Sequence, residues 1–353
     1  MRNELIRFLD TLPDIRGKRI YVWGTGNTTA LYQEGFKRIP GFRVEAYIDN
    51  NPDRQGKIMF GAPVLAPSEL QKSEDMLILV CTGQPAAWQS ISKQISGLDL
   101  PFIYIDAGIF GLFKDEITAA FDALEDDRSR AVYLSVLKTR AVCDFPDEEI
   151  VCGNQYFATP AFARPDTAET FIDCGAFVGD SIEQYLWNHE GVFGNIIGFE
   201  PDTKNFAAMK HRMERLQKEW NIPDSKLALY PCAVGETDDT AVLSQNTDNN
   251  GLGSRMAAAD GQTDGISCRI VSLSPYIKAH CLIKADIESY EYGMLHGASA
   301  AISQYKPKIA VCIYHNAVDL FSIPLLLRGL NPDYRLRVRQ HSSALAETVL
   351  YAY

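Results

Sequence analysis

The chain has 353 residues, which is long enough for two domains with sizeable hydrophobic cores. Its composition, 46% hydrophobic and 22% charged, is that of an ordinary globular protein. The formal net charge of −11 and the lack of any long basic run argue against a nucleic-acid partner. Charges interrupt the amphipathic N-terminal segment MRNELIRFLDTL, so we expect neither a signal peptide nor a membrane partner. Eight cysteines without a CxxC pair predict a reduced, cytoplasmic protein without a zinc site.

The first third of the chain alternates short apolar runs with segments of helical spacing. The apolar runs predict strands at Lys18–Trp23, Arg43–Asp49, Asp75–Cys81 and Phe102–Ile105. Strands that alternate with helices indicate a parallel, doubly wound sheet. We therefore expect a Rossmann-like domain of the nucleotide- or sugar-nucleotide-binding type over residues 1–112.

A glycine turn, GTGNTT (residues 24–29), follows the first of these strands. It keeps the first two glycines of the dinucleotide fingerprint, but Thr29 stands where the third belongs. Asp49 ends the next strand, where a ribose-binding carboxylate is expected. The turn and the later stretch YIDNNPDRQGKIMFGAPVLAPSEL resemble the small Rossmann modules attached to bacterial sugar-modifying enzymes. A nucleotide site and a retained fold without a ligand both remain open.

Residues 113–165 have a helical pattern, which predicts a bridge between two α/β domains. The stretch DEITAAFDALEDDRSRAVYLSVLKTRAV has apolar residues at helical spacing, and Asp126-Asp127-Arg128 is expected to divide it into two helices. The second helix should end before Pro146, because the residue before a proline is pushed out of the helical region. Gln155–Phe157 could cap the cleft of the second domain or pack at the domain junction.

A second glycine turn lies in DCGAFVGD, between two predicted strands. Thr170–Cys174 suits a buried parallel strand, and a helix and the strand Asn195–Phe199 follow the glycines. Glycines let the backbone approach a ligand closely, and Glu200 at the tip of the second strand can accept hydrogen bonds from both hydroxyls of a ribose. An Asp at each end of the turn favours a ligand with a cationic end. S-adenosylmethionine, which carries a ribose, an ammonium and a sulfonium, fits this pattern.

The remaining elements complete a second α/β sheet over residues 166–353. Further strands are expected at Leu227–Ala233, from Asp238, at Cys268–Leu273, Cys281–Asp286, Lys308–Tyr314, Tyr334–Arg339 and Glu347–Ala352. The last two could form an antiparallel pair that closes the sheet. The polar loop Asp248–Ser254 is expected to be mobile and close to a substrate.

Residues from about 155 to 353 resemble the FkbM family of S-adenosylmethionine-dependent methyltransferases, which act mostly on hydroxyl groups. The matching stretches, in order, are FIDCGAFVGDS, IGFEPD, YPCAVGE, IKADIESYEYGMLHGA and IYHNAVDLFSIPLLLRGLNPDYRLRVRQHS. The resemblance implies a class I methyltransferase fold with an antiparallel final strand. The sequence departs from the family at two places. The family often has Asn where Phe177 stands, which could change a contact to the methionine moiety, and usually Gly where Ser289 stands, in a turn.

The resemblance implies that S-adenosyl-L-methionine is the cofactor. Glu200 would hold the ribose diol, with an ordinary helix-capping role as the alternative. Asp173 would help to shape the pocket for the methionine end, although it could instead only brace the loop. Ala233, after Cys232, would lie under the adenine. The expected cofactor-binding residues are Asp173, Gly175, Ala176, Phe177, Gly179, Asp180, Ser181, Glu200, Pro201 and Ala233.

Methyl transfer from a sulfonium is an in-line displacement, so the enzyme mainly aligns donor and acceptor. An alcohol must also lose its proton, which requires a general base. Asp286 and His315 are the candidates because both follow strands; His315, with an ordinary pKa of about 6.5, suits pH 7 better. Asp286 could orient His315 or contact the donor, and Glu288 could bind the acceptor. A Mg²⁺ site on the two carboxylates is less favoured, and the other histidines, such as His189, are expected at the surface or as caps.

The first hypothesis is an S-adenosylmethionine-dependent O-methyltransferase that acts on a hydroxyl of a sugar, glycoconjugate or polyketide-like small molecule. The alternative is a non-catalytic nucleotide- or sugar-nucleotide-binding or regulatory protein, which Phe177 and the incomplete fingerprint at residues 24–29 keep open. An oxidoreductase is disfavoured, because no Tyr-Lys or Cys-His pair stands at a strand tip of the N-terminal domain. Aromatic residues expected to be exposed at the C-terminus, Tyr351 and Tyr353, leave a homodimer open.

Overall fold

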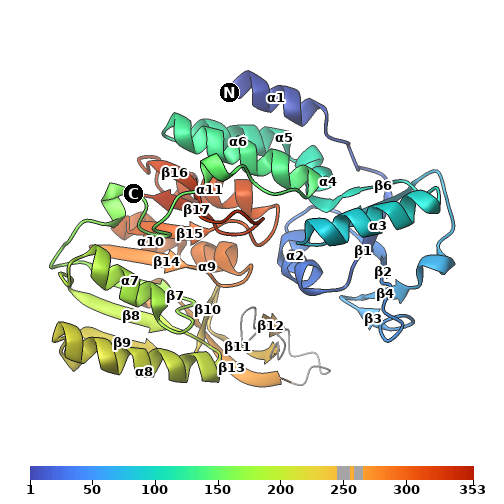
Figure 1. Ribbon diagram of the computed structural model, residues 1–353. Coiled ribbons are helices and arrows are strands. Elements are labelled where there is room, and N and C mark those ends of the chain that lie inside the picture. The colour runs from blue at the N-terminus through green and yellow to red at the C-terminus, as the bar shows by residue number, and fades with distance from the viewer. Residues whose placement is uncertain (245–254, 258–264) are drawn as a thin grey trace. The chain divides into compact units, whose positions relative to one another are not determined.

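The computed structural model describes residues 1–244, 255–257 and 265–353. The chain forms two compact units, each built from segments that are separate in the sequence (Figure 1). Unit 1 comprises Met1–Val151, Tyr314–Leu325 and Val338–Thr348, and unit 2 comprises Cys152–Ile313, Leu326–Arg337 and Val349–Tyr353. The domain boundaries expected from the sequence stay a prediction.

Unit 1 contains a sheet in which the expected strands pair in parallel. The strands are β1 (Arg19–Trp23), β2 (Val44–Ile48), β5 (Met76–Val80) and β6 (Phe102–Tyr104). Strand β1 pairs with β2 on one side and β5 on the other, and β6 pairs with β5. The crossover between β1 and β5 is the point at which an open α/β sheet presents a ligand crevice. This Rossmann-like arrangement confirms the predicted fold class.

A β-hairpin that the sequence analysis does not predict extends this sheet. Strands β3 (Ile58–Met59) and β4 (Ala62–Leu65) pair with each other in antiparallel fashion, and β4 continues the sheet beside β2. The hairpin turns at Phe60 and Gly61, whose φ angles of +52° and +78° match the type I′ turns that join two strands. Such short strands give little hydrophobic periodicity to detect.

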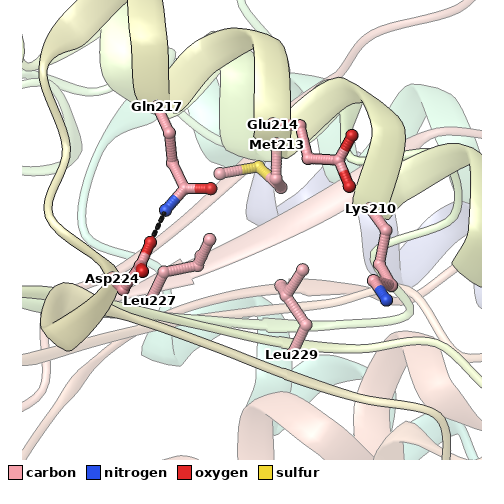
Figure 2. Close-up of a pocket in the computed structure, with 7 residues that line it drawn as sticks. All are labelled: Lys210, Met213, Glu214, Gln217, Asp224, Leu227 and Leu229. Atoms are coloured by element: carbon pink, nitrogen blue, oxygen red, sulfur yellow. Dashed lines mark hydrogen bonds between the residues drawn. The ribbon is translucent and has the colours of Figure 1, made fainter.

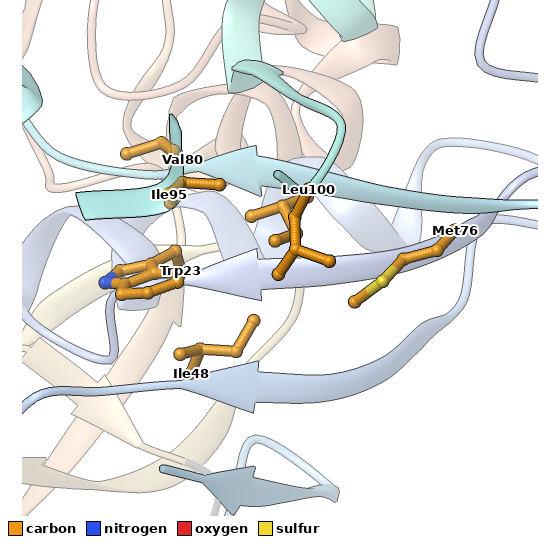
Figure 3. Close-up of a cluster of buried hydrophobic side chains, with 7 residues drawn as sticks. Trp23, Ile48, Met76, Val80, Ile95 and Leu100 are labelled. Carbon is orange, nitrogen blue, oxygen red and sulfur yellow. The ribbon is translucent and has the colours of Figure 1, made fainter. Parts of the chain in front are cut away.

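Some helices of unit 1 pack on this sheet and others pack on one another. They are α1 (Arg2–Asp10), α2 (Asn27–Lys37), α3 (Pro85–Gly97), α4 (Ile105–Leu112), α5 (Lys114–Ala123), α6 (Asp127–Val142) and the 3₁₀ turns Pro67–Glu69 and Glu148–Ile150. Asp126 caps α6 by accepting a hydrogen bond from the backbone N–H of Ser129, which explains the predicted break between two helices. One hydrophobic core lies between the sheet and α3 and includes Trp23, Ile48, Met76, Ile78, Val80, Ile95 and Leu100 (Figure 3).

A buried ionic cluster links two of these helices. Arg140 of α6 lies 2.8 Å from the carboxylate of Asp106 on α4 and donates a hydrogen bond to the hydroxyl of Tyr32 at 2.9 Å. All three side chains are buried. A buried ion pair of this kind makes both partners necessary, because either charge left alone inside the protein is costly.

The larger sheet has the strand order β16-β17-β15-β14-β7-β8-β9. Its strands are β7 (Thr170–Cys174), β8 (Asn195–Phe199), β9 (Leu227–Tyr230), β14 (Cys281–Ala285), β15 (Lys308–Cys312), β16 (Leu336–Gln340) and β17 (Thr348–Ala352). The central strands are parallel, whereas β17 is antiparallel to β15. Backbone hydrogen bonds join Arg335 to Tyr353 and His341 to Glu347, as in an antiparallel pair of β16 and β17. This order confirms the methyltransferase-type sheet.

The expected single strand Leu227–Ala233 is two strands in different sheets. Strand β9 ends at Tyr230, and Ala233 begins β10 (Ala233–Gly235). Pro231 stands between them, and a proline cannot donate to a strand ladder. Strand β10 belongs to a four-stranded sheet with β11 (Asp239–Ser244), β12 (Arg255–Ala257) and β13 (Gly265–Ser272). The loop Asp248–Ser254 lies outside the described residues.

The remaining helices pack on the larger sheet or follow its strands. They are α7 (Asp180–Asn188), α8 (Thr203–Trp220), α9 (Glu291–Gly297), α10 (Ser299–Tyr305), α11 (Asp319–Leu330) and the 3₁₀ turns Pro160–Phe162, Asp224–Lys226 and Ser274–Tyr276. A Cβ built on Gly198 of β8 would lie 3.4 Å from both Ile182 and Met209, so α7 and α8 cover the same face. No helix in the part of the chain that the structure describes has the length and apolar content needed to cross a membrane.

Tyr351, which was expected to be exposed, is buried, and His189, which was expected at the surface or as a cap, is the buried C-cap of α7. His189 is inaccessible and packs its ring on Tyr185 at 4.0 Å, and its Nε2 lies 3.2 Å from the carboxylate of Glu169. Glu169 also pairs with Lys308, so this cluster ties the end of α7 to the amino ends of β7 and β15. Tyr351 is buried because it lies in β17, inside the sheet.

Candidate functional site

The glycine turn after β7 passes close to another part of the backbone. Gly175 has φ +76°, and a Cβ at this position would lie 2.0 Å from the backbone oxygen of Asp286. Gly179, with φ +79°, is the N-cap of α7, and its Cβ would lie 3.1 Å from the side chain of Met209. Both glycines are therefore required by the conformation of the turn.

The two departures from the family pattern both fall on left-handed backbone. Phe177 has φ +48° and Ser289 has φ +80°. Asn and Gly are the residues that enter this region most readily, so the usual family residues suit these positions on physical grounds. Phe177 and Ser289 keep the same backbone conformation at an energetic cost.

Glu200 follows β8 and links the glycine turn to the start of α8. Its carboxylate accepts hydrogen bonds from the backbone N–H of Phe177 at 2.9 Å and of Asp202 at 2.8 Å. Burial raises the pKa of Glu200 to about 7, although both backbone N–H groups act in the opposite direction. The N-cap of α8 is Asp202, which accepts from the backbone N–H groups of Lys204 and Asn205. Glu200 is therefore not the capping carboxylate that was its alternative role.

Asp173 lies beneath the turn, in β7, and is inaccessible to solvent. It accepts a hydrogen bond from the hydroxyl of Ser181 and lies 3.0 Å from the ammonium of Lys284. Lys284 also donates to the backbone oxygen of Gly175 at 2.6 Å. Burial alone lowers the pKa of Lys284, but the charges of Asp173 and then Asp286 outweigh burial and raise it. The ion pair braces the glycine turn from below.

Sequence reasoning missed Lys284, and it named Tyr156 only within the stretch Gln155–Phe157, which could cap the cleft or pack at the domain junction. Lys284 is a charged residue within the apolar strand CLIKA, and a charge in a strand buried on both faces must find a partner, which is the signal that was available. Tyr156 donates from its hydroxyl to Oδ2 of Asp286 at 2.9 Å, and its ring lies 5.2 Å from the Lys284 ammonium. Tyr156 reaches the site through contacts with residues that are distant from it in the sequence.

The other expected site residues lie on several elements. Asp180 is the first residue of α7, Ala176 donates its N–H to the Phe199 oxygen at 2.9 Å, and Pro201 follows Glu200. Ala233 lies in the four-stranded sheet. Unit 2 thus brings together the glycine turn, Glu200 and Asp286, which follows β14. Glu288 lies in the same loop as Asp286 and has φ +56°.

His315 belongs to the segment Tyr314–Leu325, which is part of unit 1, whereas Asp286 and Glu288 belong to unit 2. The His315 side chain is buried, and its ring lies 4.1 Å from that of Tyr314. Its catalytic role stays a prediction.

In unit 1, the carboxylate of Asp49 binds groups of the chain itself. Its Oδ2 accepts from the backbone N–H of Thr25 and from the guanidinium of Arg54, both at 3.1 Å. Burial acts to raise the pKa of Asp49, but the hydrogen bonds from Thr25, Asn51 and Arg54 outweigh it and lower the pKa. Asp49 therefore joins the first glycine turn to Arg54 in this structure.

A pocket of about 290 Å³ between α8 and β9 lies away from these residues (Figure 2). Its lining residues are Lys210, Met213, Glu214, Gln217, Asp224, Leu227 and Leu229. Its lining includes Asp224 in the turn before β9 and Leu227 at the amino end of that strand. Ligands of open parallel sheets bind beyond the carboxyl ends, where Glu200 and the glycine turn lie.

Comparison with known proteins relates part of the chain to a known family. Residues 173–331 match the model of the methyltransferase FkbM domain. The chain therefore carries an FkbM methyltransferase domain, as its motifs predict. The structure of methyltransferase FkbM from Methylobacillus flagellatus KT is similar in fold, with a TM-score of 0.56 and 21% identity over 100% of this chain and 92% of that chain.

Two curated relatives match a shorter part of the chain. The redox-sensing transcriptional repressors Rex of Lactobacillus gasseri and Lactobacillus johnsonii are each 32% identical to it over 96 residues, which is 26% of this chain. The chain spans about two fifths of their length, since the match covers 40% of each.

Proposed function

We propose that this chain is an S-adenosylmethionine-dependent O-methyltransferase whose acceptor is a hydroxyl of a sugar, glycoconjugate or polyketide-like small molecule. The observation that carries the proposal is the hydrogen bond between the glycine turn and the carboxylate of Glu200. This buried carboxylate binds the N–H of Phe177 across the turn at 2.9 Å. The FkbM domain over residues 173–331 supports methyl transfer, and the preference of that family for hydroxyl groups motivates the acceptor class.

The residues of unit 2 fit the donor. The missing Cβ at Gly175 lets the turn after β7 contact the backbone of Asp286, so the turn and the loop after β14 lie against each other. Glu200 offers acceptor oxygens for a ribose diol, and Asp286 provides negative charge for a cationic centre. S-adenosylmethionine, when bound, supplies a methyl group that its sulfonium already activates.

The work left to the chain is alignment and proton transfer. Glu200 and the glycine turn orient the donor, and a fixed in-line geometry accounts for much of the acceleration of such a displacement. A hydroxyl acceptor loses its proton to a base within hydrogen-bonding distance. We assign this role to His315 or Asp286, with Glu288 as a hydrogen-bonding partner of the acceptor.

Calorimetric titration with S-adenosylhomocysteine tests the donor site. At pH 8.5, above the pKa of about 7 that burial gives Glu200, we expect the wild-type protein to bind it and Glu200→Gln to weaken binding by about 10- to 100-fold, because hydrogen bonds to a charged group are lost. Glu183→Gln is the matched control, since Glu183 lies on α7 and pairs with Arg212 and Arg215. Equal affinity of the wild-type and Glu200→Gln proteins would contradict the site assignment.

Parallel titrations with NAD(H) and a UDP-sugar address the alternative of a nucleotide-binding protein without methyl transfer. A signal for either ligand without binding of S-adenosylhomocysteine would move the function to unit 1. If S-adenosylhomocysteine binds, labelled S-adenosylmethionine allows hydroxylated saccharides and polyketides to be screened as acceptors. With an acceptor found, His315→Ala should slow turnover and leave donor binding intact.

A further inference from the structure

A cavity of about 240 Å³ lies in unit 1, at the amino ends of β1 and β2. Its wall is formed by residues 15–20, residues 39–43, Glu45 and Leu112. These residues belong to the segment that leads into β1, the segment that leads from α2 into β2, and the end of α4. The glycine turn of unit 1 follows the carboxyl end of β1, so the cavity lies at the opposite edge of the sheet.

Apolar side chains form one part of the wall. They are Ile15, Ile20, Ile39, Phe42 and Leu112, of which the three isoleucines are buried and the other two half-buried. A Cβ built on Gly17 or Gly41, which also line the cavity, would meet nothing within 4 Å in the described part of the chain. The volume is below the range of about 300–1,000 Å³ that is usual for drug-sized ligands, so the cavity suits a small apolar group.

Basic side chains form the other part of the wall. They are Arg16, Lys18, Arg19 and Arg43, and Glu45 is the carboxylate in the same lining. Two of these cations have acidic partners, because Arg16 pairs with Asp14 at 2.7 Å and Arg19 lies 3.7 Å from Glu45. The lining is thus basic in a chain whose net charge is −11, which favours an anion as its ligand.

Arg43 is the basic group best able to hold such an anion. Its side chain is exposed, and within the described residues it has no hydrogen bond, ion pair or ring contact. Lys18, by comparison, donates to the backbone oxygen of Glu74 at 3.2 Å, and its charge also acts on Asp75. A guanidinium without a carboxylate partner can bind a carboxylate or phosphate through two parallel hydrogen bonds.

We propose that this cavity binds a small amphipathic anion, an aliphatic carboxylate or phosphate monoester. Its charged head binds Arg43, and its hydrocarbon part lies on the apolar side chains, where it is removed from water. Inorganic phosphate lacks the apolar part, and an alkylammonium would be repelled by Arg43. The site is separate from the donor site of the proposed function and does not depend on it.

NMR titration of the full-length protein tests both requirements. We expect octanoate and octyl phosphate to bind with dissociation constants on the order of 1 mM, and octylammonium and acetate to bind at least about 10-fold more weakly. The comparison with octylammonium isolates the charge of the head, and the comparison with acetate isolates the hydrocarbon chain. Tighter binding of one of the two anions identifies the head group, and either result supports the site.

Arg43→Gln removes the charge at an exposed position, and it should weaken octanoate binding about 10-fold. Arg128→Gln is the matched control, because Arg128 is an exposed arginine of α6 outside the cavity and is likewise unpaired in the described residues. Equal octanoate affinity of the wild-type and Arg43→Gln proteins, octylammonium binding as tight as that of octanoate, or no octanoate binding by the wild type would each overturn this inference. None of these results bears on S-adenosylhomocysteine binding, which tests the proposed function separately.

Discussion

The protonation of Glu200 gives a prediction whose magnitude follows from the structure. The side chain is 6% exposed, and its carboxylate contacts two backbone N–H groups. Burial raises its pKa from an ordinary 4.5 to about 7. The change we consider is Glu200→Gln, which keeps the size of the side chain and removes the titration.

The sign follows from proton linkage. Between pH 4.5 and about 7 the folded protein keeps a proton on Glu200 that the unfolded chain has released. The free energy of unfolding therefore falls as the pH rises through this interval, and it is constant with respect to this group above and below it. At about 1.4 kcal/mol for each pKa unit, the total change is about 3 kcal/mol.

Urea unfolding of wild-type and Glu200→Gln proteins from pH 4 to pH 8.5 measures this change. The difference in free energy of unfolding, wild type minus variant, should decrease by about 3 kcal/mol as the pH rises. Affinity for S-adenosylhomocysteine should increase over the same interval, because ribose hydroxyls donate to the ionised carboxylate.

Glu169→Gln provides a control with the opposite sign. Burial acts to raise the pKa of Glu169, but the hydrogen bond from His189 and the charge of Lys308 outweigh it and lower the pKa. Glu169 thus contributes stability above its ordinary pKa that is lost as the pH falls. The reasoning for Glu200 would be refuted if the free energy of unfolding of the wild type minus that of Glu200→Gln rose with pH or did not change.

Three further substitutions and one control test the buried ion pair, the backbone at residue 289 and the close approach at Gly175. Arg140→Met should lower the free energy of unfolding by about 3–5 kcal/mol, because Asp106 stays buried without its partner. Lys138→Met, which breaks a solvent-exposed pair with Glu4, is the control and should change stability far less. Ser289→Gly should raise stability by about 1 kcal/mol, since φ is +80° there, and a lower melting temperature would contradict this. Gly175→Ala places a Cβ 2.0 Å from a backbone oxygen and should abolish binding of S-adenosylhomocysteine in calorimetry; unchanged affinity would refute the close approach.

The strands were predictable wherever an apolar run was long and bounded by polar or glycine residues. Each of the runs at β1, β5, β7 and β14 is confirmed, because a parallel strand buried on both faces needs an uninterrupted apolar stretch. The hairpin at β3 and β4 and the division at Pro231 were not predicted. These strands are short, and their pairing depends on partners that the local sequence does not specify.

The burial of His189 and Tyr351 also could not be predicted from the local sequence. His189 and Tyr351 are polar or amphipathic residues near the end of a helix or the chain, which locally favours exposure. Their burial follows from a carboxylate at residue 169 and from the strand order of the sheet. Neither can be inferred from a local window of sequence.

The sequence by itself determined the fold class, the glycine turn and Glu200, because periodicity, glycine spacing and strand-end residues are local properties of the chain. Tertiary structure alone decided how charges are shared around that turn. Lys284 pairs with Asp173, and Tyr156 orients Asp286 although the two residues are 130 positions apart. Such contacts depend on which strands become neighbours in the sheet, and strand order is a property of the whole folded chain.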